Sequence, residues 1–214
     1  MILSNTINFV KKELKNAEGG HDWFHIERVY NNTLLISETE NVNKLVVKLA
    51  ALLHDIADSK FHAGDETIGP KKAKLFLESQ NISVKDKEHI VNIIANMSYS
   101  KSLGNDTLFT SLELQVVQDA DRLDAIGAIG IARAFNYGGF KNRALYDPEI
   151  KPQIKQSKET YKKSKAPTIN HFYEKLLLLK DKMNTETGKL IANKRHEFMQ
   201  LYLDQFYAEW NGEK

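Results

Sequence analysis

The stretch of residues 44–56 is apolar on nearly every side of a helix, and it constrains the fold more than any other part of the chain. A helix that is hydrophobic all round is stable only when other elements cover it on several sides. Asn43, directly before the stretch, is a favoured helix-capping residue. We therefore expect a central, buried helix over residues 44–56.

Most other long stretches also repeat their apolar residues with helical rather than alternating spacing. Only 4 prolines and 11 glycines interrupt the 214 residues, and no stretch predicts a strand. The sequence therefore predicts an all-α fold, a helical bundle with additional C-terminal helices. Besides the central helix, we expect helices over residues 4–15, 22–39, 71–79, 83–97, 111–136, 170–183 and 185–210.

We expect a single domain over residues 1–214. Its core is predicted at about 20–136, followed by a helical extension at 137–214. Within that extension, residues 151–165 are rich in lysine and poor in apolar side chains. This segment is either a solvated connector or a basic flap that meets a polyanionic substrate.

The composition excludes several classes of site. The chain has no cysteine, which excludes disulfides, thiolate zinc sites and a cysteine nucleophile, and suits a reducing compartment. The N-terminus does not resemble a secretory signal, and no apolar run approaches the roughly 20 residues that span a bilayer. We therefore expect a cytoplasmic protein without a membrane partner. A formal net charge of +2 is too small to predict nucleic-acid binding.

His54 and Asp55 follow directly on the apolar helix. Ionisable groups are costly to bury there unless they are paired or bind a metal ion. A purely structural alternative is that His54 bonds to a backbone carbonyl and Asp55 caps the next segment. Other acids and histidines of the chain favour the metal-binding interpretation.

Asp121 is a second carboxylate in apolar surroundings, in the middle of the helix expected over 111–136. Asp124 lies three residues on, so both acids can share one helix face, and two like charges favour a nearby cation. An ion pair with Arg122 or another basic group is the alternative. His25 and His21 lie four residues apart near the start of another predicted helix; they are either a chelating pair, or His25 is the ligand and His21 a supporting or substrate contact.

Imidazole nitrogens and carboxylate oxygens suit a divalent cation of the Mn, Fe, Co, Ni, Zn or Mg group. Two of each leave coordination positions open. Such a cation lowers the pKa of a water molecule and neutralises charge on a phosphoryl oxygen.

Taken together, three segments resemble the HD superfamily of metal-dependent phosphohydrolases, in particular its YedJ- and YpgQ-like bacterial subgroup. The resemblance extends over essentially the whole chain. Its motifs are Gly20-His21-Asp22-Trp23-Phe24-His25-Ile26-Glu27-Arg28-Val29, Leu52-Leu53-His54-Asp55-Ile56-Ala57-Asp58, and Val117-Gln118-Asp119-Ala120-Asp121-Arg122-Leu123-Asp124 with the residues that follow to Gly130.

The resemblance implies an all-helical HD fold with one divalent cation held by His25, His54, Asp55 and Asp121. It implies that the substrate is a small phosphorylated molecule, with nucleotides the leading class. For this subgroup it implies release of pyrophosphate from nucleoside triphosphates, with Mn²⁺ as the leading cation. Relatives often have a histidine where this chain has Met97, and a thioether is a poor ligand for hard cations; this difference favours one metal ion over two.

Several residues near the ligands are candidates for proton transfer. Asp58, three residues beyond Asp55, is the candidate for orienting or deprotonating the attacking water; capping a turn is the alternative. Asp65 and Glu66 in the next loop are candidates for protonating the leaving group or supporting the ligands.

Phosphate requires positive charge opposite the metal ion. Arg28, one turn beyond His25, and Arg122, beside Asp121, are the first candidates. Lys60 and Lys101 are further candidates, although a surface lysine is more often simply solvated. The aromatic stripe Phe198, Tyr202, Phe206 and Trp210 is expected to be core or a homodimer seam rather than a base-stacking surface.

The leading hypothesis is therefore a nucleoside triphosphate pyrophosphohydrolase. Two alternatives use the same site for another reaction: a nucleotide monophosphatase and a nucleic-acid phosphodiesterase. A third alternative, from another class, is a non-catalytic nucleotide-binding HD module.

Overall fold

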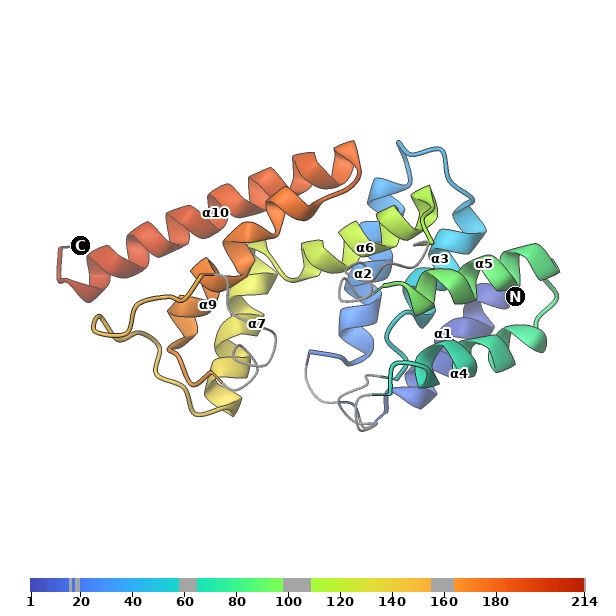
Figure 1. Ribbon diagram of the computed structural model, residues 1–214, viewed down its shortest axis with the longest axis horizontal. Coiled ribbons are helices and arrows are strands. Elements are labelled where there is room, and N and C mark those ends of the chain that lie inside the picture. Colours follow the sequence, from blue (N-terminus) through green and yellow to red (C-terminus); the bar gives the residue numbers. More distant parts are fainter. Residues whose placement is uncertain (16, 18–19, 58–64, 98–108, 155–163, 214) are drawn as a thin grey trace. The chain divides into compact units, whose positions relative to one another are not determined.

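The structure is a computed structural model that describes residues 1–15, 17, 20–57, 65–97, 109–154 and 164–213 (Figure 1). In these residues all regular secondary structure is helical, which confirms the predicted all-α class. The chain divides into two compact units, an N-terminal unit, Met1–Asp121, and a C-terminal unit, Arg122–Lys214. The prediction of a single domain with its core at about 20–136 stays a prediction; the contacts divide the chain at residue 121.

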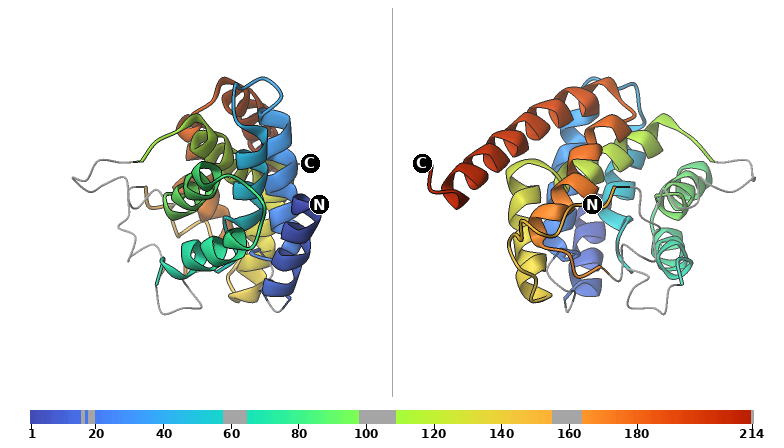
Figure 2. Two further views of the ribbon diagram at one scale, coloured as in Figure 1. Left: turned by 90° about the vertical axis from the view of Figure 1, so that its right-hand side faces the viewer. Right: turned by 60° about the vertical axis from the view of Figure 1, so that its left-hand side comes forward.

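In the N-terminal unit, one helix is surrounded by the others. This helix, α3 (Lys44–Leu53), contacts α1 (Ile2–Glu13), α2 (Trp23–Ile36) and α5 (Val84–Ala95). Figure 2 shows α3 between the α1 and α2 side and the side formed by α5 and α4 (Ile68–Glu78). Between Val46 and Leu53 every apolar residue is fully buried, and only Lys48 is partly exposed. The predicted central helix is therefore confirmed.

Helices α3 and α5 begin at side-chain caps. Asn43 Oδ1 accepts hydrogen bonds from the backbone amides of Leu45 and Val46 at 3.1 and 3.2 Å. Ser83 Oγ accepts from the amide of Asp86 at 3.0 Å. Because the first amides of a helix have no partner within the helix, such caps fix where the helix begins.

The helix predicted over 71–79 begins earlier than expected. It starts at Ile68 and continues through Gly69 and Pro70. Proline is compatible with this position because the amides of a first helical turn have no intrahelical acceptor.

The single long helix predicted over 111–136 is wrong. The structure has two helices, α6 (Leu112–Asp124) and α7 (Gly127–Phe140). Between them the chain leaves helical geometry at Ile126, which is extended (φ −129°, ψ 168°). Gly127, the first residue of α7, has φ +74°, a left-handed conformation that side chains rarely adopt. Helix α7 continues through Gly138 and Gly139, beyond the predicted end at residue 136.

The C-terminal unit is built from α7, α9 (Thr168–Glu174) and α10 (Glu186–Trp210), which pack against one another through α7. The helix predicted over 170–183 is instead α9 followed by two 3₁₀ turns, Leu176–Leu178 and Lys180–Lys182. Thr185 Oγ1 accepts from the amide of Gly188 and caps α10.

The aromatic stripe of α10 is only partly covered within this unit. The Tyr202 ring lies about 6 Å from those of Phe135 and Phe172, with centroid distances of 6.1 and 6.0 Å. The Phe206 ring stacks on that of Trp210. Tyr202 and Phe206 are partly buried, whereas Phe198 and Trp210 are 50% and 49% exposed, so the stripe as core or dimer seam stays a prediction.

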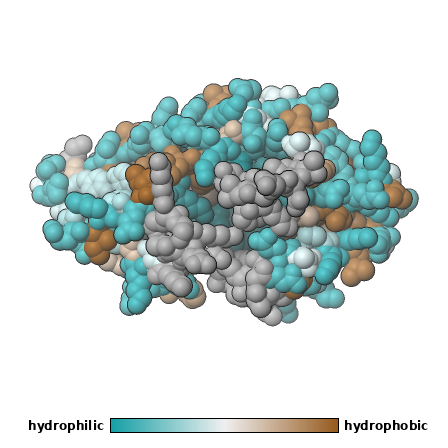
Figure 3. Space-filling model, in the orientation of Figure 1, coloured by the Kyte–Doolittle hydropathy of each residue, from teal (hydrophilic) through white to brown (hydrophobic). Residues whose placement is uncertain are grey.

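No helix of the described residues is long and apolar enough to cross a membrane. On the face drawn in Figure 3 the exposed apolar residues form separate patches among hydrophilic ones.

The first prediction concerns the backbone at Gly127. A Cβ at this residue would lie 3.0 Å from Arg195 Cγ, in addition to the positive φ. We expect Gly127→Ala to lower the free energy of unfolding by about 1–3 kcal/mol, measured by urea denaturation. Gly139→Ala is the matched control, because nothing lies within 4 Å of its Cβ position and alanine is favoured over glycine in a helix by about 0.5–1 kcal/mol. An equal loss in both variants would contradict this account of the helix break.

The second prediction concerns His171. Burial, with Lys175 and Arg143 nearby, lowers its pKa to about 3. Between about pH 3 and 6.5 the unfolded chain therefore binds more protons at this residue, so its contribution to stability is complete above pH 6.5 and lost as the pH falls. The loss from pH 7 to 5 is at most about 2 kcal/mol. We expect His171→Gln to have a correspondingly flatter pH dependence of unfolding free energy; an unchanged slope would refute the assignment.

Candidate metal centre

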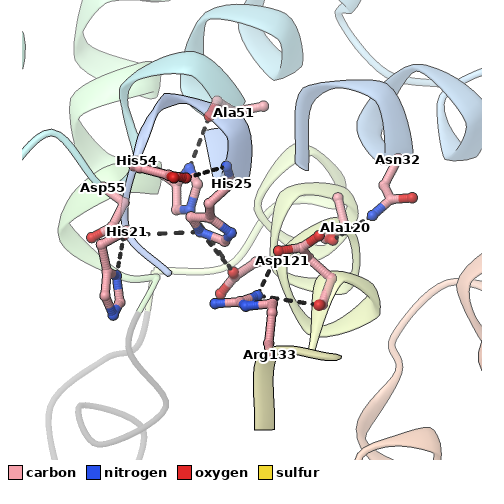
Figure 4. Close-up of polar contacts among 11 residues, drawn as sticks. His21, His25, Asn32, Ala51, His54, Asp55, Ala120, Asp121 and Arg133 are labelled. Atoms are coloured by element: carbon pink, nitrogen blue, oxygen red, sulfur yellow. Dashed lines mark hydrogen bonds and ion pairs between the residues drawn. The ribbon is translucent and has the colours of Figure 1, made fainter. Parts of the chain in front are cut away.

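Three helices of the N-terminal unit bring their predicted ligands together (Figure 4). His25 lies in the first turn of α2, His54 is the residue that ends α3, and Asp121 lies in the last turns of α6. Each is placed at or near a helix end, where the side chain can leave the packed interior. The predicted His25, His54 and Asp121 thus converge although they are far apart in the sequence.

The ligand atoms of these three residues are mutually close. His25 Nε2 lies 3.5 Å and His54 Nε2 lies 3.9 Å from Asp121 Oδ1. The three ligand atoms all lie within 4.8 Å of one another. Since nitrogen and oxygen ligands bind a transition metal at about 2.0–2.2 Å, this spacing is close to what one shared cation requires.

The His54 ring is held in the tautomer that a metal site requires. Its Nδ1 lies 2.8 Å from the carbonyl oxygen of Ala51. A carbonyl only accepts, so Nδ1 carries the proton and donates, which leaves Nε2 with a lone pair directed at the cluster. A backbone carbonyl that orients a ligating histidine in this way is a common supporting contact in metal sites. The hydrogen bond from His54 to a backbone carbonyl, expected as the alternative to metal binding, is therefore present. It is compatible with a role of His54 as a metal ligand.

Hydrogen bonds also fix the other two ligand-bearing helices. Asp22 Oδ1 accepts from the amide of His25 at 3.0 Å and caps α2 at the ligand itself. Asn32 Nδ2, on the buried face of α2, donates to the carbonyl of Ala120 at 3.1 Å. This bond ties α2 to α6 one residue before Asp121, so it sets the distance between the two elements at the site.

Asp55 makes its shortest contact with His21. Its Oδ2 lies 2.6 Å from His21 Nδ1 and 3.9 Å from His25 Nε2. Burial would raise the pKa of Asp55, but the hydrogen bond from His21 and the neighbouring histidines outweigh it and hold the pKa below its usual value. Asp55 is therefore an ionised carboxylate at the edge of the cluster, with His21 as its supporting donor.

The donor set fits a divalent transition metal. The side chains of His25 and His54 are 3% and 5% exposed. The Asp121 side chain is 43% exposed, so the cluster has one open side. Buried nitrogen donors with exposed carboxylate oxygens provide firm attachment together with access for water and substrate.

The structure describes only some of the other predicted residues. Asp58, Lys60 and Lys101 lie outside the described residues. Arg28 is partly buried on α2, one turn beyond His25. Asp65 is exposed and its Oδ1 accepts from the amide of Thr67 at 2.8 Å, whereas Glu66 is partly buried.

Asp124 and Arg122 have structural partners within the C-terminal unit. Asp124 is 1% exposed and its Oδ2 lies 2.5 Å from Arg133 Nη1, so a bound cation is not needed to neutralise it, contrary to the sequence argument for two acids beside a cation. Arg122 Nη1 donates to the carbonyl of Lys182 at 2.8 Å. The alternative ion pair of Asp121 with Arg122 is not among the contacts that the structure gives for the described residues.

Sequence reasoning missed two supporting residues, Asn32 and Asp22. Asn32 lies on the apolar face of α2 that also carries Ile26, Val29 and Ile36. An amide at a core position is costly unless it is hydrogen-bonded, so this interruption of the apolar pattern was the available signal.

Comparisons with known proteins agree with this arrangement. The family model of the HD domain matches residues 23–126. YpgQ of Bacillus subtilis is 36% identical over 208 residues, covering 95% of this chain and 91% of YpgQ. A crystal structure of an HD-superfamily hydrolase from Bacillus thuringiensis is 44% identical, with a TM-score of 0.79 over 98% of this chain and 97% of that one. The crystal structure of YpgQ in complex with ADP has a TM-score of 0.75 at 36% identity, covering 97% and 94% of the two chains.

The third prediction tests the ligands by stability. A cation that binds only the folded chain stabilises it by about 2.7 kcal/mol at 100 times its Kd. We expect Mn²⁺ added to chelator-treated protein to raise the melting temperature, and His54→Ala and Asp121→Ala to remove most of this increase and the bound metal measured by elemental analysis. His89→Ala is the matched control in the same unit, because His89 contacts Ser111 rather than the cluster. Metal content that is unchanged in Asp121→Ala would exclude this site.

Proposed function

Because the chain belongs to the HD superfamily, in the group of YpgQ, and is a metal-dependent phosphohydrolase, we propose that it acts on a small nucleotide. The proposed reaction releases pyrophosphate from a nucleoside triphosphate. Water adds to the α-phosphorus and the bond from that phosphorus to the α,β-bridging oxygen breaks, which yields a nucleoside monophosphate and pyrophosphate. The observation that supports it most directly is the His25, His54 and Asp121 cluster with its one open side.

The ligand set proposed for the cation is His25, His54, Asp55 and Asp121. When bound, a divalent cation activates water and neutralises phosphoryl charge. We propose Mn²⁺ because imidazole and carboxylate together suit metals of intermediate hardness. Asp22 and the carbonyl of Ala51 accept hydrogen bonds at this arrangement and Asn32 donates one. These bonds fix helix ends and one ring, so little reorganisation is needed on binding.

Other residues of the chain complete the proposed site. Arg28 follows His25 by one turn of α2 and is proposed to contact a phosphate oxygen, since a guanidinium can donate two parallel hydrogen bonds. Asp58 is proposed to orient the attacking water, and Asp65 or Glu66 to assist the leaving group. Lys60, Lys101, Arg122 and His21 remain proposed as further substrate contacts.

A nucleotide substrate is further supported by the relative. The YpgQ crystal structure was determined in complex with ADP, and YpgQ and this chain cover each other almost completely. A nucleotide monophosphatase would use the same cluster, so the products decide between the two reactions. A binding-only module has no need of a ligand set with an open side.

The fourth prediction is enzymatic. Metal-free protein reconstituted with Mn²⁺, Co²⁺ or Mg²⁺ is assayed with ATP, ADP, AMP and a generic phosphodiester, and pyrophosphate and phosphate are measured separately. We expect pyrophosphate and AMP from ATP in a one-to-one ratio. Asp121→Asn should reduce the rate at least about 1,000-fold, because loss of several kcal/mol of charge stabilisation has this effect. Asp204→Asn, on exposed α10 surface, should leave the rate unchanged.

Phosphate release from AMP in preference to ATP would replace this proposal by a monophosphatase. Absence of turnover with every cation and substrate, in protein that binds the metal, would refute the enzymatic proposal.

A further inference from the structure

The buried side chain of Asn32 joins the two helices that carry His25 and Asp121. Asn32 is 9% exposed, and its Nδ2 donates to the carbonyl of Ala120 on α6 at 3.1 Å (Figure 4). On the same two helices, His25 Nε2 lies 3.5 Å from Asp121 Oδ1. Helix α2 therefore meets α6 at two adjacent residues, once through proposed metal ligands and once through an amide that is not a ligand.

The Ala120 carbonyl belongs to the peptide group that leads to Asp121. A peptide group is planar, so its carbonyl is rigidly connected to the Cα of the following residue. The hydrogen bond from Asn32 therefore restrains the Cα of Asp121. Between this point and the carboxylate oxygens, only the side-chain torsions of the aspartate are left to vary.

On α2, Asn32 lies on the same face as the ligand His25. It follows His25 by seven residues, which is almost two full turns of the helix. One face of α2 therefore carries both the imidazole and the amide that holds the backbone of the neighbouring ligand helix.

The hydrogen bond is not required by the helix that accepts it. A carbonyl within an α-helix accepts from the amide four residues on, and α6 continues for four residues beyond Ala120, to Asp124. The apolar core does not require an amide on α2 either. Replacing a hydrogen-bonding group by an apolar one of similar shape can be nearly neutral for stability when no partner is left unsatisfied. Stability of the fold alone therefore does not explain the amide at residue 32.

The Asp121 carboxylate depends on this hold on its backbone more than the imidazoles do. Its side chain is 43% exposed, whereas both histidine ligands are almost fully buried. Packing against neighbours therefore restrains the carboxylate less than it restrains the imidazole rings. Another amide contact of α6, from Gln118 Nε2 to the carbonyl of Asn96 at 3.2 Å, lies three residues before the ligand.

We propose, on the basis of the ligand set proposed above, that Asn32 is a positioning residue of the metal centre. By holding the peptide group before Asp121 against α2, it places the carboxylate where it and His25 can bind one cation. Residues that orient metal ligands without touching the ion typically change metal affinity roughly 10- to 100-fold when they are replaced. Asn32 thus sets how tightly the cation is held, while the ligands provide the bonds.

The fifth prediction compares metal affinity with stability in Asn32 variants. Co²⁺ is titrated into chelator-treated full-length protein and followed by visible absorption, and the urea midpoint of the metal-free protein is measured separately. We expect Asn32→Leu, which keeps the volume but removes the donor, to bind Co²⁺ about tenfold more weakly than wild type. The spectrum of bound Co²⁺ should change as well, because it depends on the arrangement of the ligands. Asn32→Ala, which cannot clash in the core, should show the same weakening.

Two controls separate positioning from stability. Val10→Ala, in the buried core face of α1, should lower the urea midpoint and leave the affinity for Co²⁺ unchanged. Gln118→Met removes the amide contact of α6 that lies further from Asp121, and it should weaken Co²⁺ binding less than Asn32→Leu does.

The outcomes distinguish this role from the metal centre itself. Equal Co²⁺ affinity and an equal spectrum in wild type and both Asn32 variants would refute the positioning role and leave the metal centre intact. Equal weakening in Gln118→Met or Val10→Ala would also refute it, because the effect would then not be specific to the bond at Ala120. If wild-type protein binds no Co²⁺, or His54→Ala binds it equally well, the metal centre is refuted and this role with it.

Discussion

A hydrogen bond at the end of the buried helix, from His54 Nδ1 to the carbonyl of Ala51, connects the candidate metal centre to the core. Helix α3 is fixed by burial on all sides, so the position of its last turn is determined by the core of the N-terminal unit. The hydrogen bond fixes the orientation of the His54 ring relative to this helix. A metal site built in this way is an extension of the hydrophobic core, and mutations that loosen the core are expected to disturb the site as well.

The parts of the fold predicted from sequence were those in which a local signal and the tertiary structure agree. The apolar run after Asn43 predicted the central helix because a helix without a polar face is stable only when it is buried. His25, His54 and Asp121 were recognisable because each is a polar group beside apolar neighbours, and they do converge. The resemblance to the HD superfamily added the expected order of ligands, which spacing alone does not provide.

The predictions were wrong where the local sequence is compatible with two different structures. Gly127 permits both a continuous helix and a left-handed break, and the close packing of Arg195 against it accompanies the break. Asp124 was interpreted as a partner of Asp121, because three residues on a helix bring side chains together, but Arg133, nine residues on, neutralises it. The helix break and the partner of Asp124 both depend on contacts across the junction of α6 and α7, and the chain makes these contacts only when it is folded. Asp58, Lys60 and Lys101 lie outside the described residues, so their roles stay predictions.

The unequal exposure of the ligands has a consequence for metal exchange. The two imidazoles are almost fully buried, whereas Asp121 presents nearly half of its side chain to solvent. If these three residues hold the proposed cation, we expect it to enter and leave past the carboxylate while the two histidines stay in place. In such a site the occupant follows the supply of ions in the surroundings as well as intrinsic affinity. The enzyme is thus expected to sample several metals over its lifetime, and the one isolated with it will reflect the growth medium.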